Sequence, residues 1–232
     1  MPDAREVYQH HPEEYDALVR CEDHQGNLLG ALRARVTLEG AEVVECGAGT
    51  GRVTALLAPQ VRRIRAFDLA APMLEVARQN LAAKGITNCT LAVADNAALP
   101  VESESADLAV AGWSYGHQTV WTPGAWRAPI EQALREMLRV LRPGGAAVVI
   151  ETLGTGHETP FTPPQGLQEY YKMMEAELGF ARSWIRTDYS FPSLAEGERL
   201  VRFFFGEERA ARFAAAGSTV LPECTGVWVR RR

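Results

Sequence analysis

Short apolar runs alternate along the chain with stretches in which apolar residues recur at helical spacing. The runs predict strands, and the spaced positions predict helices that pack on them. The expected strands are residues 41–46, 61–67, 90–94, 106–111, 146–152, 184–191 and 219–229. The expected helices are residues 5–35 with a break at Gly26, then 52–59, 72–84, 128–142, 167–179 and 193–215. The alternation up to residue 152 is typical of an α/β fold, with helices on both faces of a parallel sheet.

We divide the chain into an N-terminal helical cap, residues 1–38, and an α/β domain, residues 39–232. Two irregular segments are expected to be loops: residues 112–127 are rich in aromatic side chains, and residues 154–166 are rich in glycine and proline. Ligands of open α/β sheets bind beyond the carboxyl ends of the strands. Residues that follow the predicted strands are therefore the first candidates for a site.

Composition narrows the classes of partner. The chain has 232 residues and a formal net charge of −5, and its one dense basic run, residues 230–232, is expected to be a solvated tail. Nucleic-acid-binding proteins usually carry a basic face, so we expect no nucleic-acid partner. No apolar run reaches the ~20 residues of a membrane-spanning helix, so we expect no membrane partner. Oligomeric state is not predicted.

The four cysteines form no CxxC pair and no cluster with histidines at zinc-site spacing. This pattern favours neither disulfides nor a structural metal. The polar N-terminal stretch has mixed charge and is not typical of a signal peptide. A cytoplasmic location is therefore expected.

The run Glu45-Cys46-Gly47-Ala48-Gly49-Thr50-Gly51 follows the first predicted strand and precedes a helix. Its glycines allow a tight turn and close approach of a ligand to the backbone, and the helix start favours an anionic group. A dinucleotide site prefers Gly-x-Gly-x-x-Gly, which would require glycine at the position of Arg52. A plain strand-to-helix turn is the structural alternative.

Two acidic positions extend the pattern. Asp68 ends the second predicted strand, 21 residues after Gly47, where an acid can bind ribose hydroxyls. The alternative is an N-cap for the helix that begins near Pro72. Asp95 and Asn96 end the third strand, where they could bind an exocyclic amine and a ring nitrogen, or form a local turn.

These motifs, with Leu138-Arg139-Val140-Leu141-Arg142-Pro143-Gly144-Gly145 before the fifth strand, resemble those of class I S-adenosylmethionine-dependent methyltransferases, above all the broad group that modifies small molecules. The resemblance is strong over residues 40–152. It implies a Rossmann-like, doubly wound, seven-stranded, mostly parallel sheet whose last strand is antiparallel. It also implies S-adenosylmethionine as cofactor, S-adenosylhomocysteine as product and a small-molecule methyl acceptor.

The resemblance further implies a role for each motif. The Glu45 carboxylate and the glycine turn would hold the methionine part, Asp68 the ribose, and Leu69 and Asp95 the adenine. The full expected cofactor set is Glu45, Cys46, Gly47, Ala48, Gly49, Gly51, Asp68, Leu69, Met73, Asp95, Asn96, Ala97, Ala111, Gly112 and Trp113.

Several branches of the family are disfavoured. Enzymes that methylate nucleobase amino groups usually carry Asp/Asn-Pro-Pro-Tyr/Phe after the fourth strand, where this chain has Ala111-Gly112-Trp113-Ser114. The nucleophilic cysteine of cytosine-C5 enzymes is missing from the same region. Residues 112–127 contain no acid, so no catalytic metal is expected.

The acceptor is expected between the N-terminal segment and the loops 112–127 and 153–166. Tyr15, Trp113 and Trp121 are the candidate acceptor contacts. The loop's aromatic rings could wall the acceptor, form a box for a cationic amine, or simply pack the loop on the core. His117 and Tyr115 are the candidate catalytic residues, and His157 is a weaker candidate base, because imidazole titrates near neutral pH.

Other functions stay open on the sequence alone. A nicotinamide-dependent oxidoreductase could use a similar sheet, although Arg52 interrupts its glycine pattern. A protein that binds S-adenosylmethionine without catalysis would keep the same motifs. An RNA-modifying enzyme is a further alternative, disfavoured by the acidic charge.

Overall fold

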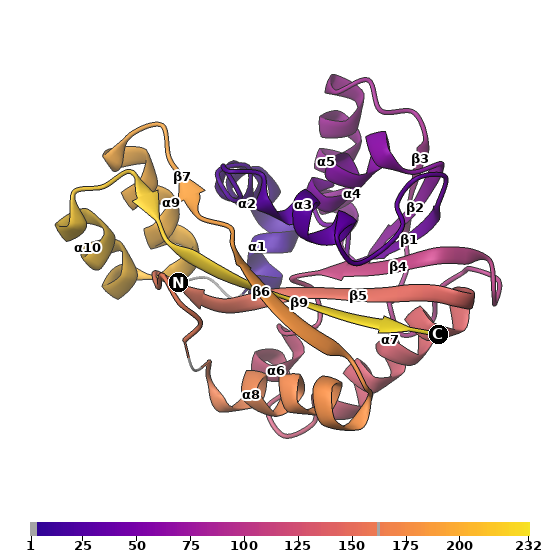
Figure 1. Ribbon diagram of the computed structural model, residues 1–232. Helices are drawn as coiled ribbons and strands as arrows, with labels where there is room; N and C mark the ends of the chain where they lie inside the picture. Colours follow the sequence, from indigo (N-terminus) through magenta and orange to yellow (C-terminus); the bar gives the residue numbers. More distant parts are fainter. Residues whose placement is uncertain (1–3, 162) are drawn as a thin grey trace.

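The computed structural model describes residues 4–161 and 163–232, and seven of its strands form one sheet in the order β3-β2-β1-β4-β5-β9-β6 (Figure 1). These strands are β1 (Glu42–Cys46), β2 (Arg63–Asp68), β3 (Cys89–Val93), β4 (Ala106–Gly112), β5 (Leu141–Thr155), β6 (Ala181–Arg186) and β9 (Glu223–Arg231). The strands β1 to β5 run parallel, and β9 is antiparallel to both β5 and β6. The predicted mostly parallel sheet with an antiparallel last strand is confirmed.

Helices cover both faces of this sheet. They are α1 (Ala4–His10), α2 (Pro12–Val19), α3 (Asn27–Arg33), α4 (Arg52–Leu57), α5 (Ala71–Ala83), α6 (Gln118–Trp121), α7 (Arg127–Val140), α8 (Gln165–Lys172), α9 (Leu194–Phe205) and α10 (Glu207–Ala216), with a 3₁₀ turn at Ala58–Gln60 and a π turn at Met173–Glu177. In Figure 1, α3, α4 and α5 lie on one side of the sheet, and α7 and α8 lie on the other.

The side chains of neighbouring residues in β1 belong to different cores, which explains why both faces of the sheet are covered. Val43 belongs to the apolar core under α3, α4 and α5, whereas the next residue, Val44, belongs to the core under α7 and α8. Successive strand residues point to opposite faces, so a strand with two neighbouring buried valines must be covered on both sides. Val43 pairs with Ile64 of β2 and Leu108 of β4, which puts β1 at the centre of the parallel strands.

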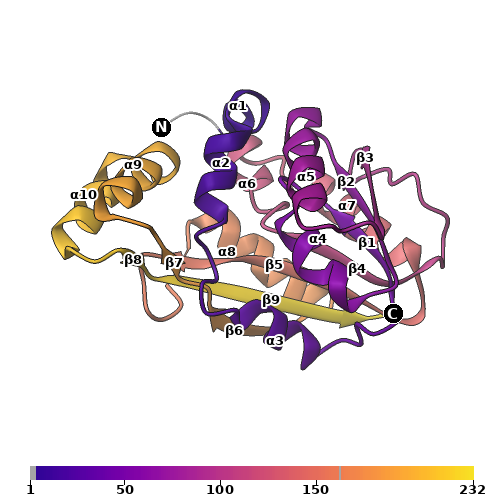
Figure 2. The ribbon, with the colours of Figure 1, turned by 90° about the horizontal axis from the view of Figure 1, so that it is seen from above.

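A third, smaller apolar core lies beyond the carboxyl end of β5. It joins Leu18 of α2 to side chains of α9, α10 and the two-stranded sheet of β7 (Tyr189–Ser190) and β8 (Val220–Leu221). Figures 1 and 2 show α1, α2, α9 and α10 gathered at this end. Within the expected cap, α3 packs on the main sheet, whereas α2 shares a core with the C-terminal helices; the division at residue 38 stays a prediction.

Two expected elements are corrected. The strand expected at 184–191 ends at Arg186, and Tyr189–Ser190 pairs in the small sheet instead. The chain bends there because Asp188 accepts hydrogen bonds from Arg186 and from the backbone N–H of Glu223, at 2.8 and 2.9 Å. The helix expected at 193–215 is interrupted by Gly206, whose φ of 88° is incompatible with helix.

Among the described residues, no helix is long and apolar enough to cross a membrane. The same part of the chain contains no group of three His, Cys, Asp or Glu side chains that could hold a metal ion.

Candidate active site

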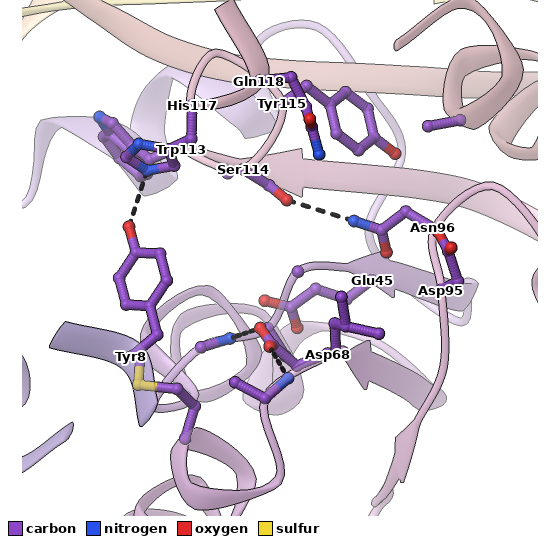
Figure 3. Close-up of a pocket in the computed structure, with 18 of the residues that line it drawn as sticks. Tyr8, Glu45, Asp68, Asp95, Asn96, Trp113, Ser114, Tyr115, His117 and Gln118 are labelled. Atoms are coloured by element: carbon purple, nitrogen blue, oxygen red, sulfur yellow. Dashed lines mark hydrogen bonds between the residues drawn. The ribbon is translucent and has the colours of Figure 1, made fainter. Parts of the chain in front are cut away.

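A cavity of about 510 Å³ opens at the carboxyl ends of the parallel strands, between the main sheet and helices α1 and α2 (Figure 3). Its volume is within the usual range for small-molecule sites. The lining residues are Arg5, Tyr8, Gln9, Tyr15, Glu45, Gly47, Ala48, Gly49, Thr50, Arg52, Val53, Asp68, Leu69, Ala70, Met73, Asp95, Asn96, Ala97, Gly112, Trp113, Ser114, Tyr115, His117, Gln118, Trp121, Pro129, Ile130 and Ala133.

The glycine turn after β1 forms one side of the cavity. The backbone N–H groups of Gly47 and Ala48 both donate to the carbonyl of Phe67, at 2.8 and 2.9 Å, which fixes the turn to β2. Gly47 has a φ of +73°, and a Cβ built on it would lie 2.1 Å from Oγ of Ser114. Only glycine therefore fits at this position, and the turn keeps its backbone open to the cavity.

Asp68 is held in place by the same turn. Its carboxylate accepts hydrogen bonds from the N–H groups of Gly49, at 2.7 Å, and Ala70, at 2.8 Å. Burial raises the pKa of Asp68, and these two donors partly oppose the shift. The N–H of Leu69 also lowers this pKa, and a carboxylate has about four acceptor positions, so acceptor capacity remains for a ligand.

Asp95 and Asn96 line the end of the cavity opposite Tyr8 and His117 (Figure 3). The Asp95 carboxylate accepts from the N–H of Ala97 at 2.8 Å, so the alternative of a local turn is realised. The Asn96 amide nitrogen donates to the Ser114 hydroxyl at 3.3 Å. Its amide oxygen is buried, and no partner for it exists in the described part of the chain. That oxygen is an unsatisfied acceptor on a residue that lines the cavity.

Glu45 is buried beneath the turn. Its carboxylate accepts a hydrogen bond of 2.6 Å from the Thr54 hydroxyl of α4. Burial raises the pKa of Glu45 to about 7, although the Thr54 hydrogen bond opposes the shift. The group is therefore poised between its charged and neutral forms near neutral pH, and a cation placed beside it would favour the charged form.

His117 contacts two aromatic side chains at the other end of the cavity. Its Nε2 lies 2.8 Å from the hydroxyl of Tyr8, and its ring stacks on Trp121 at 5.3 Å between centroids. Burial lowers the pKa of His117 to about 4, partly opposed by a hydrogen bond with the backbone of Trp113. The imidazole is thus neutral at pH 7 and can accept a proton from a neighbour.

Trp113 adopts a rare backbone conformation, with a φ of +50°. The guanidinium of Arg52 stacks on its ring, 3.7 Å from the centroid, and is itself ion-paired with the buried Glu22. Non-glycine residues in the left-handed region cost free energy and persist only where their surroundings hold them. The Glu22–Arg52 pair therefore fixes Trp113 as a wall of the cavity.

Glu151 supports the loop that carries His117. It follows the buried run of β5, and its carboxylate accepts a 2.9 Å hydrogen bond from the N–H of Gly116. Burial raises the pKa of Glu151 to about 7, and this hydrogen bond opposes the shift. An acid directly after the apolar run 146–150, within the same strand, is the sequence signal that could have singled it out.

Most of the sequence-predicted site residues line the cavity, including Tyr15, Trp113, Trp121 and His117. Leu69 lines it with 71% of its surface exposed, as an apolar platform. Cys46, Gly51 and Ala111 lie within the strands and turn behind the lining.

Three expectations about the acceptor side are corrected. The hydroxyl of Tyr115 is buried in the core, so it cannot reach an acceptor, although the ring borders the cavity. His157 stacks on Phe161 outside the cavity, at 4.1 Å between centroids. None of the described residues in 153–166 lines the cavity, because this loop packs towards β8 and α10 instead.

Sequence reasoning missed the residues that only tertiary packing brings to the cavity. Arg5, Tyr8 and Gln9 come from α1, and Arg52 begins α4. The position of Arg52, directly after the glycine turn, was the available signal for that residue. No local pattern singles out Tyr8.

Comparison with known proteins finds similarity to methyltransferases. Residues 43–145 match the methyltransferase-domain family. The chain is 34% identical to a demethylmenaquinone methyltransferase of Clavibacter sepedonicus over 53% of this chain and 46% of that protein. It is 28% identical to a demethylmenaquinone methyltransferase of Lactococcus lactis over 85% of this chain and 79% of that protein.

The chain spans about half the length of the first curated relatives that it matches. Its fold resembles that of a SAM-dependent methyltransferase from Aquifex aeolicus, with a TM-score of 0.55 and 14% identity over 98% of this chain and 93% of that chain. Residues 43–145 thus resemble a methyltransferase domain, and the chain shares the fold of an S-adenosylmethionine-dependent methyltransferase.

Proposed function

We propose that the protein transfers a methyl group from S-adenosylmethionine to a small-molecule acceptor bound in the cavity. The observation that carries this proposal is the Asp68 carboxylate, which backbone N–H groups of Gly49 and Ala70 hold at the cavity while part of its acceptor capacity stays open. A ribose presents the pair of hydroxyls that such a carboxylate binds.

The remaining polar groups fit the same cofactor. Leu69 offers an exposed apolar face for adenine, and the unpartnered oxygen of Asn96 accepts from a ligand N–H. The glycine turn brings its backbone to the cavity for the methionine part, and a Cβ at Gly47 would collide with Ser114 beside it. Burial raises the pKa of Glu45 to about 7, and the cationic amine of that part would favour the charged form of this carboxylate. Met73 and the backbone of 111–113 complete the proposed site.

The cofactor supplies a methyl group on a positively charged sulfur, which is already activated for transfer. The protein's tasks are therefore to align the acceptor, to exclude water and to remove one proton. Tyr8 and His117 suit the last task, because the Tyr8 hydroxyl is 2.8 Å from the imidazole Nε2. Tyr8 would receive the acceptor's proton as it gives its own to neutral His117. Trp113, Tyr15 and Trp121 would hold the acceptor.

A small acceptor is supported by the size of the cavity and by the relatives, two of which are named for demethylmenaquinone. The acidic net charge argues against a nucleic acid as the methyl acceptor. A cytoplasmic location is part of the proposal and rests on four free cysteines.

The first experiment measures thermal unfolding with S-adenosylhomocysteine and, in parallel, with NAD. A ligand at 100 times its Kd adds about 2.7 kcal/mol of stability, which for a chain of this size raises Tm by about 5 to 10 °C. We expect this rise with S-adenosylhomocysteine alone and its loss in Asp68→Asn, because the Asn amide group presents N–H where Asp68 accepts hydrogen bonds. A rise with NAD alone would overturn the proposal in favour of an oxidoreductase.

A protein that binds the cofactor without catalysis would give the same thermal shift. Formation of S-adenosylhomocysteine from S-adenosylmethionine in the presence of phenolic acceptors separates the two. Binding without turnover over a broad acceptor panel would favour the non-catalytic function.

A further inference from the structure

The part of the cavity formed by α1, α2 and the loop after β4 has a distinct composition. We call it the acceptor half: its aromatic residues are Tyr8, Tyr15, Trp113, His117 and Trp121, and its other polar residues are Arg5, Gln9 and Gln118. The carboxylates that line the cavity belong to Glu45, Asp68 and Asp95, which follow or end β1, β2 and β3. Figure 3 shows Asp95 and Asn96 at the end opposite Tyr8 and His117. The acceptor half therefore has aromatic faces and amides, but its charged lining residue is a cation.

Both tryptophan rings of the acceptor half already hold a guanidinium group. Arg52 lies over Trp113 at 3.7 Å from the centroid, and Arg5 lies over Trp121 at 4.8 Å. An aromatic face attracts cations through its quadrupole, and one bound cation weakens the attraction for a second. The cofactor would add a positive sulfur to the same space.

These contacts disfavour the box for a cationic amine that the aromatic loop suggested. They instead favour a flat ring, which gains from offset or edge contacts with aromatic side chains without needing positive charge. The amides of Gln9 and Gln118 and the hydroxyl of Tyr8 can hydrogen-bond to the edge of such a ring.

We propose that the methyl acceptor is a planar hydroxylated ring compound, a phenol or an enol, that carries no positive charge. This inference rests on the proposed methyl transfer and names its substrate class. In the transfer, a lone pair of the hydroxyl oxygen forms the new O–CH₃ bond, and the C–S bond breaks with its electron pair left on sulfur. The hydroxyl proton passes to the Tyr8 oxygen while the Tyr8 proton passes to Nε2 of His117.

The acidity of the acceptor supports the same class. His117 has a pKa of about 4, so it is a weak base. A phenol has a pKa of about 10, whereas water has a pKa of about 16. A base this weak assists an acidic hydroxyl far better than a hydroxyl whose acidity is close to that of water.

The test compares ligands that share one ring system and differ in charge. Isothermal titration with S-adenosylhomocysteine-loaded protein measures the Kd of 2-naphthol, of 2-naphthoate and of N,N,N-trimethyl-2-naphthylammonium. We expect the ammonium compound to bind at least about tenfold more weakly than 2-naphthol. With S-adenosylmethionine, we expect 2-naphthol to be methylated and 2-decalol, a non-planar alcohol, not to be.

Arg5→Glu reverses the charge in the acceptor half, so we expect it to tighten binding of the ammonium compound at least about threefold and to weaken binding of 2-naphthoate. Arg33→Glu makes the same charge change outside the cavity and serves as the matched control. Equal or tighter binding of the ammonium compound by the unmodified protein would overturn the inference. The inference would also be overturned if the protein bound S-adenosylhomocysteine but none of the naphthyl compounds. Loss of S-adenosylhomocysteine binding itself would instead overturn the proposed function.

Discussion

The hydroxyl of Tyr8 lies 2.8 Å from Nε2 of His117, although 109 residues separate them along the chain. One residue belongs to the first helix, and the other belongs to the loop after β4. The contact connects the N-terminal segment to the end of the sheet and encloses the acceptor half of the cavity. It also turns a lone loop histidine into half of a pair that can move a proton.

If the two residues act as a pair, Tyr8→Phe and His117→Gln should both lower the rate of the same step, the transfer of the acceptor's proton. Each should lower kcat for methylation of 2-naphthol by about 10² to 10⁴, and the double variant should lose little more than either single variant, because both act on one proton. S-adenosylhomocysteine affinity should stay within about twofold. His157→Gln, outside the cavity, is the matched control. Additive losses in the double variant would contradict a shared role.

The buried Glu151 predicts a pH-dependent stability. Its pKa is raised from 4.5 to about 7, so the folded protein binds an extra proton between these values, and this contribution to stability is lost as pH rises through 7. Glu151→Gln does not titrate, and its amide oxygen can still accept from Gly116. From pH 5 to pH 8, its free energy of unfolding should therefore rise relative to wild type by about 2 to 3 kcal/mol.

Urea denaturation at both pH values measures this difference, because other titrating groups cancel between the two proteins. The exposed Glu39→Gln variant is the control for a simple change in net charge. A difference between Glu151→Gln and wild type that does not vary with pH would count against the raised pKa.

The glycine turn predicts a position-specific effect of alanine. Gly47 and Gly85 both have positive φ, at +73° and +66°, but only Gly47 would bring a Cβ against Ser114. Gly85→Ala should therefore cost about 1 to 2 kcal/mol of stability from backbone strain and leave S-adenosylhomocysteine binding unchanged. Gly47→Ala should have the same strain and, in addition, should lose S-adenosylhomocysteine binding, which isothermal titration measures. Unchanged ligand affinity in folded Gly47→Ala would show that the turn does not hold the cofactor.

The pair beneath Trp113 predicts non-additive destabilisation. Arg52→Gln leaves the buried Glu22 without its ion-pair partner and should cost about 3 to 5 kcal/mol. Adding Glu22→Gln removes the stranded charge, so the double variant should be more stable than Arg52→Gln alone, as measured by chemical denaturation. If the two substitutions instead destabilise additively, Glu22 and Arg52 do not act as a pair.

The sequence by itself determined the α/β class, the parallel strand run to residue 152 and the side of the cavity that the strand ends form. These features are local: apolar strands, the turn from Glu45 to Gly51, and acids at strand ends, which a parallel sheet must bring to one edge. The strand expected at 184–191 was wrong as one element, because its residues favour extended structure without specifying which sheet they join. The pairing with Glu223 and Val220–Leu221 decided where the chain bent.

Only the tertiary structure decided the acceptor side. The sequence offered Tyr115 and His157 on residue type alone, but burial removed the hydroxyl of the first and packing put the second outside the cavity. The partner of His117 could not be predicted, because nothing local to Tyr8 records which helix docks on which loop. Strand periodicity fixes neighbours within a sheet, whereas helices and loops beyond its edge are placed by side-chain packing between segments far apart in the chain.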